Sequence, residues 1–282
     1  MVCVDTRSSS NCVMVCSGSS TKLPEFAGSM RRIEENGYTI TEGFGCSGGS
    51  AVLGIKAAGM ETDCIKDTLM AINFGDIIKI DIWRVLKNIA FHQDIVIDRG
   101  KKYFDMLLKL TNGIRCRDTK FPFTCTASDL KGRKCVLLGT KHTPDELLAT
   151  VIYCSSTIPY GFSQKSINGV WLADGGMYKN FPVDLVPNDG RMVFGHLIDS
   201  DEPPSRDGKW WFGTASLLLD NLLDFNVNTS IEIAKKELGD KFRFIETDGL
   251  NIGTLDFNIS HEKKVALYEQ GYKESSKLIE EV

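Results

Sequence analysis

The stretch Gly45-Cys46-Ser47-Gly48-Gly49 decides the expected fold of this chain, because it lies where a strand pattern meets a helix pattern. Residues 38–44 before it favour a strand, and residues 50–58 after it favour a helix that closes at Gly59. The glycines on either side of Ser47 allow a sharp bend without a Cβ clash. The stretch therefore predicts a strand–turn–helix unit.

A second unit of the same kind precedes it in the chain. The apolar residues 12–16 predict a short buried strand, and residues 17–20 predict a loop of small residues. Pro24 suits the first turn of a helix, and Gly37 suits the position just after the end of that helix. Two successive units favour an α/β fold with a mainly parallel sheet, which binds its ligands at the carboxyl ends of the strands.

The remaining sequence fits a single domain over residues 12–282, preceded by a flexible leader over residues 1–11. Residues 63–110 have a helical pattern with many large apolar side chains, which either a helical insertion over the sheet end or an ordinary core layer explains. Asn168-Gly169 predicts a two-residue hairpin. Further strands are expected at 121–127, 134–138 and 192–197, and a loop at 199–208. Three further helices are expected. The first runs from the capping box Thr143-Pro144-Asp145-Glu146 to about Cys154, the second from Thr214 to about Asp224, and the third from the N-cap Ser260 to the C-terminus.

Composition narrows the classes of function. The chain has 282 residues and a net charge of −4, and its cations form no run, which argues against nucleic-acid binding. Because no 18 uncharged apolar residues run together, we expect a cytoplasmic protein with at most peripheral membrane contacts. The nine cysteines are irregularly spaced and suit reduced, buried thiols; none has the spacing of a zinc site. The sequence leaves the oligomeric state open.

Ser47 is the candidate nucleophile. Gly45-x-Ser47-x-Gly49 is the pattern of a nucleophile elbow, in which the serine is held exposed on a turn between a strand and a helix. The helix start also directs backbone N–H groups and the positive end of the helix dipole at an oxyanion. The five-residue pattern alone is weak, since a serine can also simply form a tight turn, but its place between strand and helix strengthens it.

A serine hydroxyl needs a base to take its proton. Asp174 ends an expected strand and is followed by Gly175-Gly176, so it can meet another strand-end turn of the same sheet; the alternative is that Asp-Gly-Gly is only a turn. Partial removal from water would make such a carboxylate more basic. None of the four histidines stands at a glycine-flanked strand end: His92, His142, His196 and His261.

Several sequence blocks together resemble the patatin-like phospholipase family. Residues 16–22, with 26–28 and 34–37, look like the glycine-rich oxyanion loop and first helix of that family, and residues 45–50 look like its nucleophile elbow. Residues 126–130 resemble a family strand end. The last blocks, Ser155-Ser156-Thr157-Ile158-Pro159 and Asp174-Gly175-Gly176-Met177-Tyr178-Lys179-Asn180-Phe181-Pro182, look like the family's surroundings of the catalytic aspartate.

The resemblance implies a three-layer α/β/α sandwich and a lipid acyl hydrolase of the phospholipase A type that needs no cofactor and no metal. Ser47 would be the nucleophile and Asp174 its base, with phospholipids or other lipid esters as substrates. The residues expected to hold the oxyanion or the substrate are Gly18, Ser19, Ser20, Lys22 and Gly48, and those expected to shape the two turns are Gly45, Gly49, Gly175 and Gly176.

One departure from the family pattern leaves two alternatives open. The family's oxyanion loop has three successive glycines, but here Ser19 and Ser20 follow Gly18, while Lys22 keeps the basic position. If these serines misplace the backbone donors, the protein would be a weakly active or inactive lipid-binding or regulatory member of the family. The second alternative is a Ser-His-Asp esterase that uses one of the four histidines.

Membrane access has its own candidate, Trp210-Trp211-Phe212, which follows a polar, proline-containing stretch. Indole rings settle well at a bilayer interface, so this segment could dip into one. Packing of the same rings on the core beside Leu217-Leu218-Leu219 is the more frequent arrangement for such a segment.

Overall fold

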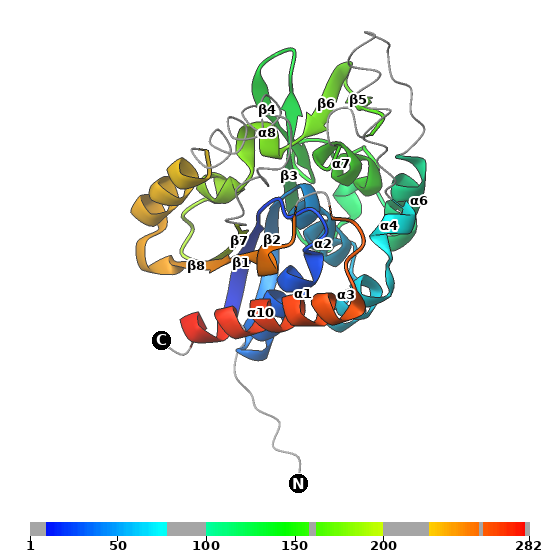
Figure 1. Cartoon of the computed structure of the whole chain (residues 1–282). Helices are drawn as coiled ribbons and strands as arrows, with labels where there is room; N and C mark the ends of the chain where they lie inside the picture. Colours follow the sequence, from blue (N-terminus) through cyan, green and yellow to red (C-terminus); the bar gives the residue numbers. More distant parts are fainter. Residues whose placement is uncertain (1–9, 78–99, 158–161, 200–225, 254–255, 280–282) are drawn as a thin grey trace, which may run out of the picture.

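The computed structural model describes residues 10–77, 100–157, 162–199, 226–253 and 256–279. Its centre is an eight-stranded sheet in the order β5-β6-β3-β2-β1-β7-β8, with β4 paired to β3 (Figure 1). Parallel pairing joins β3, β2, β1, β7 and β8, whereas β4, β6 and β5 are antiparallel additions at one edge. The fold is therefore α/β with a mainly parallel sheet, as the two strand–turn–helix units predicted.

The strands follow the expected pattern closely. Asn168 and Gly169 connect β5 and β6 with positive φ of 51° and 77°, the conformation that a two-residue hairpin requires. The bounds of the strands are β1 Ser10–Cys16, β2 Tyr38–Cys46, β3 Phe123–Asp129, β4 Lys134–Gly139, β5 Lys165–Ile167, β6 Val170–Asp174, β7 Met192–Ile198 and β8 Phe242–Thr247.

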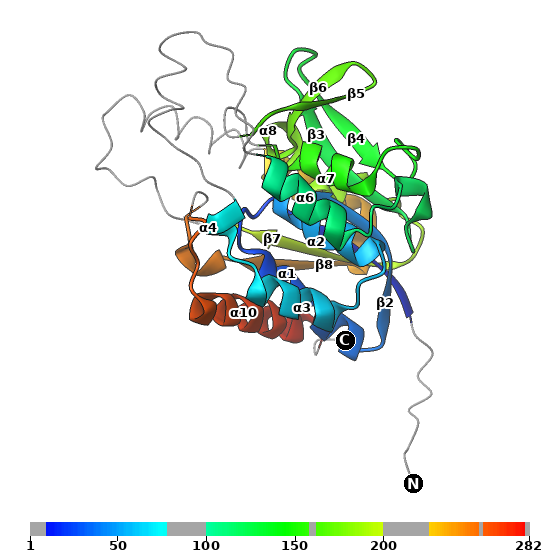
Figure 2. The ribbon, with the colours of Figure 1, turned by 90° about the vertical axis from the view of Figure 1, so that its right-hand side faces the viewer.

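Most helices cover one face of the sheet. The N-terminal helix α1 packs along α10, and α2 and α7 lie against β2 and β3 (Figures 1 and 2). The helices are α1 Leu23–Glu35, α2 Ser47–Ala57, α3 Thr62–Ala71, α4 Phe74–Ile77, α6 Lys101–Leu110, α7 Leu148–Ser155, α8 Gly176–Lys179 and α10 His261–Ile279, with short 3₁₀ turns at η1 Cys116–Asp118, η2 Pro182–Leu185, η3 Gly239–Lys241 and η4 Gly249–Asn251. Residues 226–238 form a further helix.

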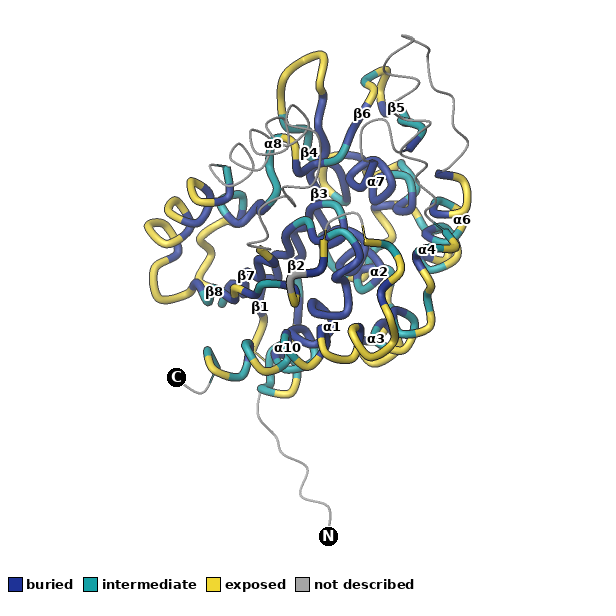
Figure 3. Tube along the Cα trace, viewed as in Figure 1, coloured by how far each residue is buried: buried dark blue, intermediate teal, exposed yellow. Residues whose placement is uncertain are grey.

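The opposite face carries a thinner layer. Along β1, alternate side chains point to opposite faces: Cys12 and Met14 join the core beneath the larger helical layer, and Val13 and Val15 join a second core. That second core is closed by η2 and the helix 226–238. Both faces of the central strands are buried (Figure 3), which makes the three layers expected from the family resemblance.

The expected helix at the Thr143 capping box was wrong at its start. The helix α7 begins only at Leu148. The carbonyls of Pro144 and Glu146 accept hydrogen bonds from the backbone N–H groups of Arg117 and Cys116, at 3.0 and 2.9 Å. These bonds to η1 occupy carbonyls that a first helical turn would have used.

Among the elements longer than one turn, β8 and the helix 226–238 were not predicted, and neither were the short helix α8 or the 3₁₀ turns. Several expectations fall outside the described residues: the 1–9 part of the leader, the 78–99 part of the helical 63–110 stretch, and nearly all of the 199–224 loop and helix, including Trp210-Trp211-Phe212. In the described parts of 63–110, α3, α4 and α6 are present. No helix within the described ranges is both long and apolar enough to cross a membrane.

Candidate active site

Ser47 is the first residue of α2 and follows directly on β2. Its φ is +46°, a left-handed conformation that costs a residue with a Cβ about 1–2 kcal/mol. Neighbouring groups hold it there: its N–H donates to Ser155 Oγ at 3.0 Å, and its carbonyl accepts from Ser50 Oγ at 2.6 Å and Ser156 Oγ at 3.1 Å. Strain of this kind, maintained by several hydrogen bonds, is typical of functional turns.

The glycines around Ser47 are required by close backbone contacts. A Cβ on Gly45 would lie 2.7 Å from Ser50 Cα, and a Cβ on Gly49 would lie 2.4 Å from the carbonyl oxygen of Ser17. A Cβ on Gly48 would meet the carbonyl oxygen of Ser20 at 2.8 Å. Strand β2, helix α2 and the loop after β1 can therefore approach one another only with glycine at these positions.

Ser47 and Asp174 meet across the sheet edge. Ser47 Oγ donates to Asp174 Oδ2 at 2.7 Å, although the two residues are 127 positions apart in the sequence. Asp174 ends β6, its N–H donates to Thr157 O at 2.7 Å, and the Gly176 N–H donates to its Oδ1 at 2.8 Å. A Cβ on Gly175 would lie 2.3 Å from Thr126 O, so this turn, too, needs its glycine.

The Asp174 carboxylate is more basic than an ordinary aspartate. Removal from water raises its pKa from 3.8 to about 6, while the hydrogen bonds from Ser47 and Gly176 act in the opposite direction. No lysine or arginine in the described part of the chain forms an ion pair with it. At neutral pH the group is thus ionised, with a proton affinity that suits a base acting near that pH.

The loop after β1 lies against the elbow. A Cβ on Gly18 would lie 3.5 Å from Ser47 Cβ and 2.3 Å from Asn180 Oδ1. The Gly18 N–H donates to Asn180 O at 3.1 Å, so it is already used within the protein. Among the described residues, neither the Ser19 N–H nor the Gly48 N–H has a hydrogen-bond partner, which leaves these two as backbone donors beside Ser47.

Lys22 points away from the pocket at Ser47. Its side chain is buried, its ammonium donates to Ile252 O at 3.3 Å, and its stem lies against Gly249. Burial lowers its pKa, and the nearby Glu25 opposes that shift. Thr21 Oγ1 likewise donates to Asp256 O at 2.8 Å. The two side chains fasten this loop to the C-terminal part of the chain.

A pocket opens over Ser47 and is mostly apolar. One of its walls comes from the loop after β1 and another from the helical stretch that the sequence singled out. Its lining residues are Ser20, Thr21, Leu23, Ser47, Gly48, Phe74, Tyr103, Ser156, Phe162 and Phe257. Aromatic and aliphatic walls next to a hydroxyl and a carboxylate suit an ester with an apolar chain.

The described histidines do not contact Ser47 or Asp174. His196 is buried in β7, where its Nδ1 lies 2.7 Å from Ser29 Oγ and its Nε2 lies 3.0 Å from Thr247 Oγ1. Burial lowers its pKa to about 3. His142 follows β4 and His261 begins α10, both on the surface. The expectation for His92 lies outside the described residues.

Sequence reasoning gave no role to Ser155, Ser156 or Asn180, although all three hold the site together. Their positions were visible as parts of the quoted blocks 155–159 and 174–182. What the sequence alone did not show is that a hydroxyl of Ser155 replaces a backbone acceptor for the Ser47 N–H.

The family comparison gives one match. The sequence model of a family described as patatin-like phospholipase matches residues 14–187, which is more than half of the chain. The matched range contains the loop after β1, the elbow at Ser47 and the turn at Asp174. The comparison with curated proteins gives no match.

Solved structures show the same fold at low sequence identity. VipD from Legionella pneumophila is 13% identical, with a TM-score of 0.56 over 98% of this chain and 67% of VipD. A chain in the complex of full-length SpcU with full-length ExoU from the type III secretion system of Pseudomonas aeruginosa is 12% identical, with a TM-score of 0.50 over 97% of this chain and 53% of that chain. This chain thus spans about half to two thirds of these proteins, and the likeness concerns the fold alone.

Proposed function

The chain belongs to the patatin-like phospholipase family, and we propose that it hydrolyses fatty-acyl esters of phospholipids with Ser47 as nucleophile and Asp174 as its only base. The observation that carries the proposal is the 2.7 Å hydrogen bond from Ser47 Oγ to Asp174 Oδ2, at a helix start that opens into an apolar pocket. The family consists of lipid hydrolases, so the coarser activity follows from membership. The dyad and the phospholipase A type are our proposal.

The chemistry proceeds in two halves. Ser47 Oγ attacks the ester carbonyl as its proton passes to Asp174 Oδ2, and the proton then goes to the leaving alcohol as the ester C–O bond breaks. Water next attacks the acyl-enzyme while Asp174 accepts its proton, and this proton returns to Ser47 Oγ as the fatty acid leaves. The Asp174 carboxylate is therefore regenerated in each turnover.

The oxyanion is assigned to the N–H groups of Ser19 and Gly48. Both belong to backbone that contacts the elbow, and Gly48 is in the first turn of α2, where the positive end of the helix dipole also favours the oxyanion. The Gly18 N–H, which the family resemblance also suggested, is not assigned this role because it donates to Asn180 O. Lys22 is assigned a structural role, because its buried ammonium fastens the loop after β1 to Ile252 O.

A panel of phospholipids, lysolipids and neutral lipids tests the proposal. Wild-type protein should release fatty acid from at least one phospholipid, and Ser47→Ala and Asp174→Asn should each remove that activity while the circular dichroism spectrum stays unchanged. The four single changes His92→Ala, His142→Ala, His196→Ala and His261→Ala separate the dyad from a Ser-His-Asp esterase. Loss of activity in one of the histidine variants that folds normally, with Asp174→Asn still active, would overturn the proposal.

The second candidate, a weakly active lipid-binding member of the family, has one observation in its favour. Ser20 has a φ of +54°, in the left-handed region where the usual glycine of the loop is better accommodated. Replacing Ser19 and Ser20 together by glycine decides between the two. A rate gain of about 10² or more, the typical worth of one oxyanion donor, would favour the weakly active protein; a gain below about threefold with an active wild type would favour the working hydrolase.

A further inference from the structure

Two hairpins extend past the catalytic edge of the sheet. Cys46 pairs with Thr126, and Ala127 pairs with Asp174, so Ser47 and Asp174 lie level with Ala127. The turn between β3 and β4 begins three residues further along, at Leu130. At about 3.3 Å per residue, that turn projects roughly 10 Å beyond the dyad.

The β5–β6 hairpin projects in the same direction. Strand β6 is antiparallel to β3, with Ser128 opposite Ala173, so continuing that register brings Trp171 level with Leu130. The two hairpins lie side by side at the top of the molecule in Figure 1 and again in Figure 2. Both therefore belong to the end of the molecule at which the pocket over Ser47 lies.

The β3–β4 turn is cationic and exposed. Lys131, Arg133 and Lys134 are all exposed, and Leu130 between strand and turn is 39% exposed (Figure 3). Asp129, the acidic residue that borders this turn in the sequence, is buried, and its Oδ1 accepts the Gly132 N–H at 2.7 Å. The three cations thus have no salt-bridge partner within the described parts of the chain.

The β5–β6 hairpin adds a large exposed ring. Trp171 is 63% exposed, the most exposed of the large apolar side chains described. Residues 162–173 contain no aspartate or glutamate, and neither do residues 130–138. These two hairpins are therefore locally cationic and apolar, although the whole protein carries a net charge of −4.

We propose that the two hairpins, through Leu130, Lys131, Arg133, Lys134 and Trp171, dock the protein on an anionic phospholipid bilayer. Lysine and arginine side chains near a membrane are attracted by its negative surface potential, and an indole ring settles at the level of the headgroups. A projection of roughly 10 Å brings the hairpin tips into the interface while the dyad stays at its border. The purpose of this docking, presenting lipid to Ser47, rests on the proposed function; the docking itself does not.

Vesicle sedimentation tests the docking separately from catalysis. The protein is the Ser47→Ala variant, which leaves the lipid intact, and the vesicles are pure phosphatidylcholine or phosphatidylcholine with 30% phosphatidylserine. We expect at least tenfold stronger binding to the anionic vesicles at low salt, and a steep loss of that binding as salt rises. Equal binding to both vesicles, or binding to neither, would overturn the proposal whatever the outcome for hydrolysis.

Matched charge variants locate the surface. Lys131→Gln/Lys134→Gln should weaken binding to anionic vesicles about 25-fold, because each lost charge weakens it about fivefold. The control Lys263→Gln/Lys273→Gln removes two exposed lysines of α10, at the opposite end of the molecule in Figure 1, and should change binding less than twofold. A control that loses as much binding as the hairpin variant would show that net charge alone is responsible and would overturn the assignment.

Aromatic variants complete the test. Trp171→Ala should weaken binding about fivefold or more and Trp171→Phe less, because a phenyl ring keeps part of the interfacial preference. Trp210→Ala/Trp211→Ala tests the competing segment. If that double variant abolishes binding while Trp171→Ala and the lysine pair leave it unchanged, the hairpins are not the docking surface.

Discussion

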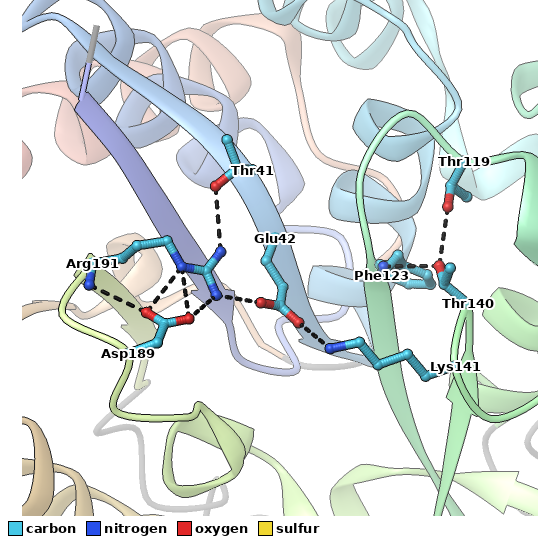
Figure 4. Close-up of polar contacts among 8 residues, drawn as sticks. All are labelled: Thr41, Glu42, Thr119, Phe123, Thr140, Lys141, Asp189 and Arg191. Atoms are coloured by element: carbon cyan, nitrogen blue, oxygen red, sulfur yellow. Dashed lines mark hydrogen bonds and ion pairs between the residues drawn. The ribbon is translucent and has the colours of Figure 1, made fainter.

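Two carboxylates of the same sheet, the buried Glu42 and the partly buried Asp174, have opposite surroundings. Glu42, in β2, accepts from Arg191 Nη2 at 2.5 Å and from Lys141 Nζ at 3.0 Å (Figure 4). Arg191 also pairs with Asp189, which extends the network. Among the residues that the structure describes, Asp174 has only the Ser47 hydroxyl and the Gly176 N–H as side-chain partners. One carboxylate is neutralised by cations, and the other is stabilised only by neutral donors.

This difference separates a structural carboxylate from a reactive one. Cations beside a buried carboxylate compensate for its lost hydration but also reduce its affinity for a proton. Asp174 lacks them, and burial raises its pKa to about 6. Desolvation without a paired cation thus gives Asp174 the proton affinity that a base needs.

The largest expected contrast is in rate. Asp174→Asn should lower kcat/KM for a lipid ester by about 10²–10⁴, the usual contribution of a general base. Glu42→Gln removes a carboxylate from the other site and should leave kcat/KM within about threefold in the folded protein. Steady-state kinetics on one phospholipid measures both; equal losses in the two variants would erase the distinction.

The next contrast is in stability. Arg191→Met leaves Glu42 buried with only Lys141, whose side chain is 61% exposed, and should lower the free energy of unfolding by about 3 kcal/mol. Lys141→Met should cost no more than about 0.5 kcal/mol, because an exposed partner contributes little. Urea denaturation of the two variants measures the difference. A larger loss of stability in Lys141→Met than in Arg191→Met would show that Lys141, and not Arg191, is the main partner of Glu42.

A pH effect on stability should distinguish Asp174. Its folded pKa of about 6 exceeds its ordinary 3.8, so its contribution to stability is complete below pH 3.8 and is lost as pH rises through 6. Two pKa units correspond to about 3 kcal/mol. Asp174→Asn, which cannot ionise, should therefore be more stable than wild type by up to about 3 kcal/mol at pH 8 and by little at pH 4. Denaturant melts at both pH values measure the stability of Asp174→Asn minus that of wild type. A difference that is smaller at pH 8 than at pH 4 would contradict this prediction.

The smallest effect concerns the loop beside the elbow. Ser20 has a positive φ and Ser19 does not. Ser20→Gly should therefore raise the free energy of unfolding slightly, by about 0.5 kcal/mol, because relief of strain outweighs the added freedom of the unfolded chain. Ser19→Gly, the matched control, should lower it by a similar amount. Denaturant melts of the two variants compare them directly, and identical shifts would mean that φ at Ser20 is not strained.

Local signals predicted the parts of the fold that depend on backbone conformation. The left-handed glycines at 37 and 59, the Asn168-Gly169 hairpin and the glycines of the elbow all recur in the structure, because each solves a steric problem that few residues can solve. Asp174 was recognisable for the same reason, as a strand-end residue followed by two glycines. The sequence therefore supplied both members of the pair that meets at the sheet edge.

Long-range partners were not predictable in this way. The capping box at Thr143 is locally sound, but hydrogen bonds to η1 override it. Lys22 stands where the family pattern has a basic residue, yet its orientation depends on Ile252, 230 positions away. The hydrogen bond from the Gly18 N–H to Asn180 O and the ion pairs of Glu42 with Arg191 and Lys141 likewise form only in the folded chain. Such contacts arise only when distant segments pack.

Labelling of Ser47 by a fluorophosphonate ester tests the central claim most directly, because it requires an activated serine but no knowledge of the natural lipid. We predict that mass spectrometry finds the label on Ser47, that the rate in wild type falls about tenfold per unit below pH 6, and that Asp174→Asn labels at least 10² times more slowly. Labelling of Asp174→Asn at the wild-type rate, or loss of labelling in a correctly folded histidine variant, would contradict the account.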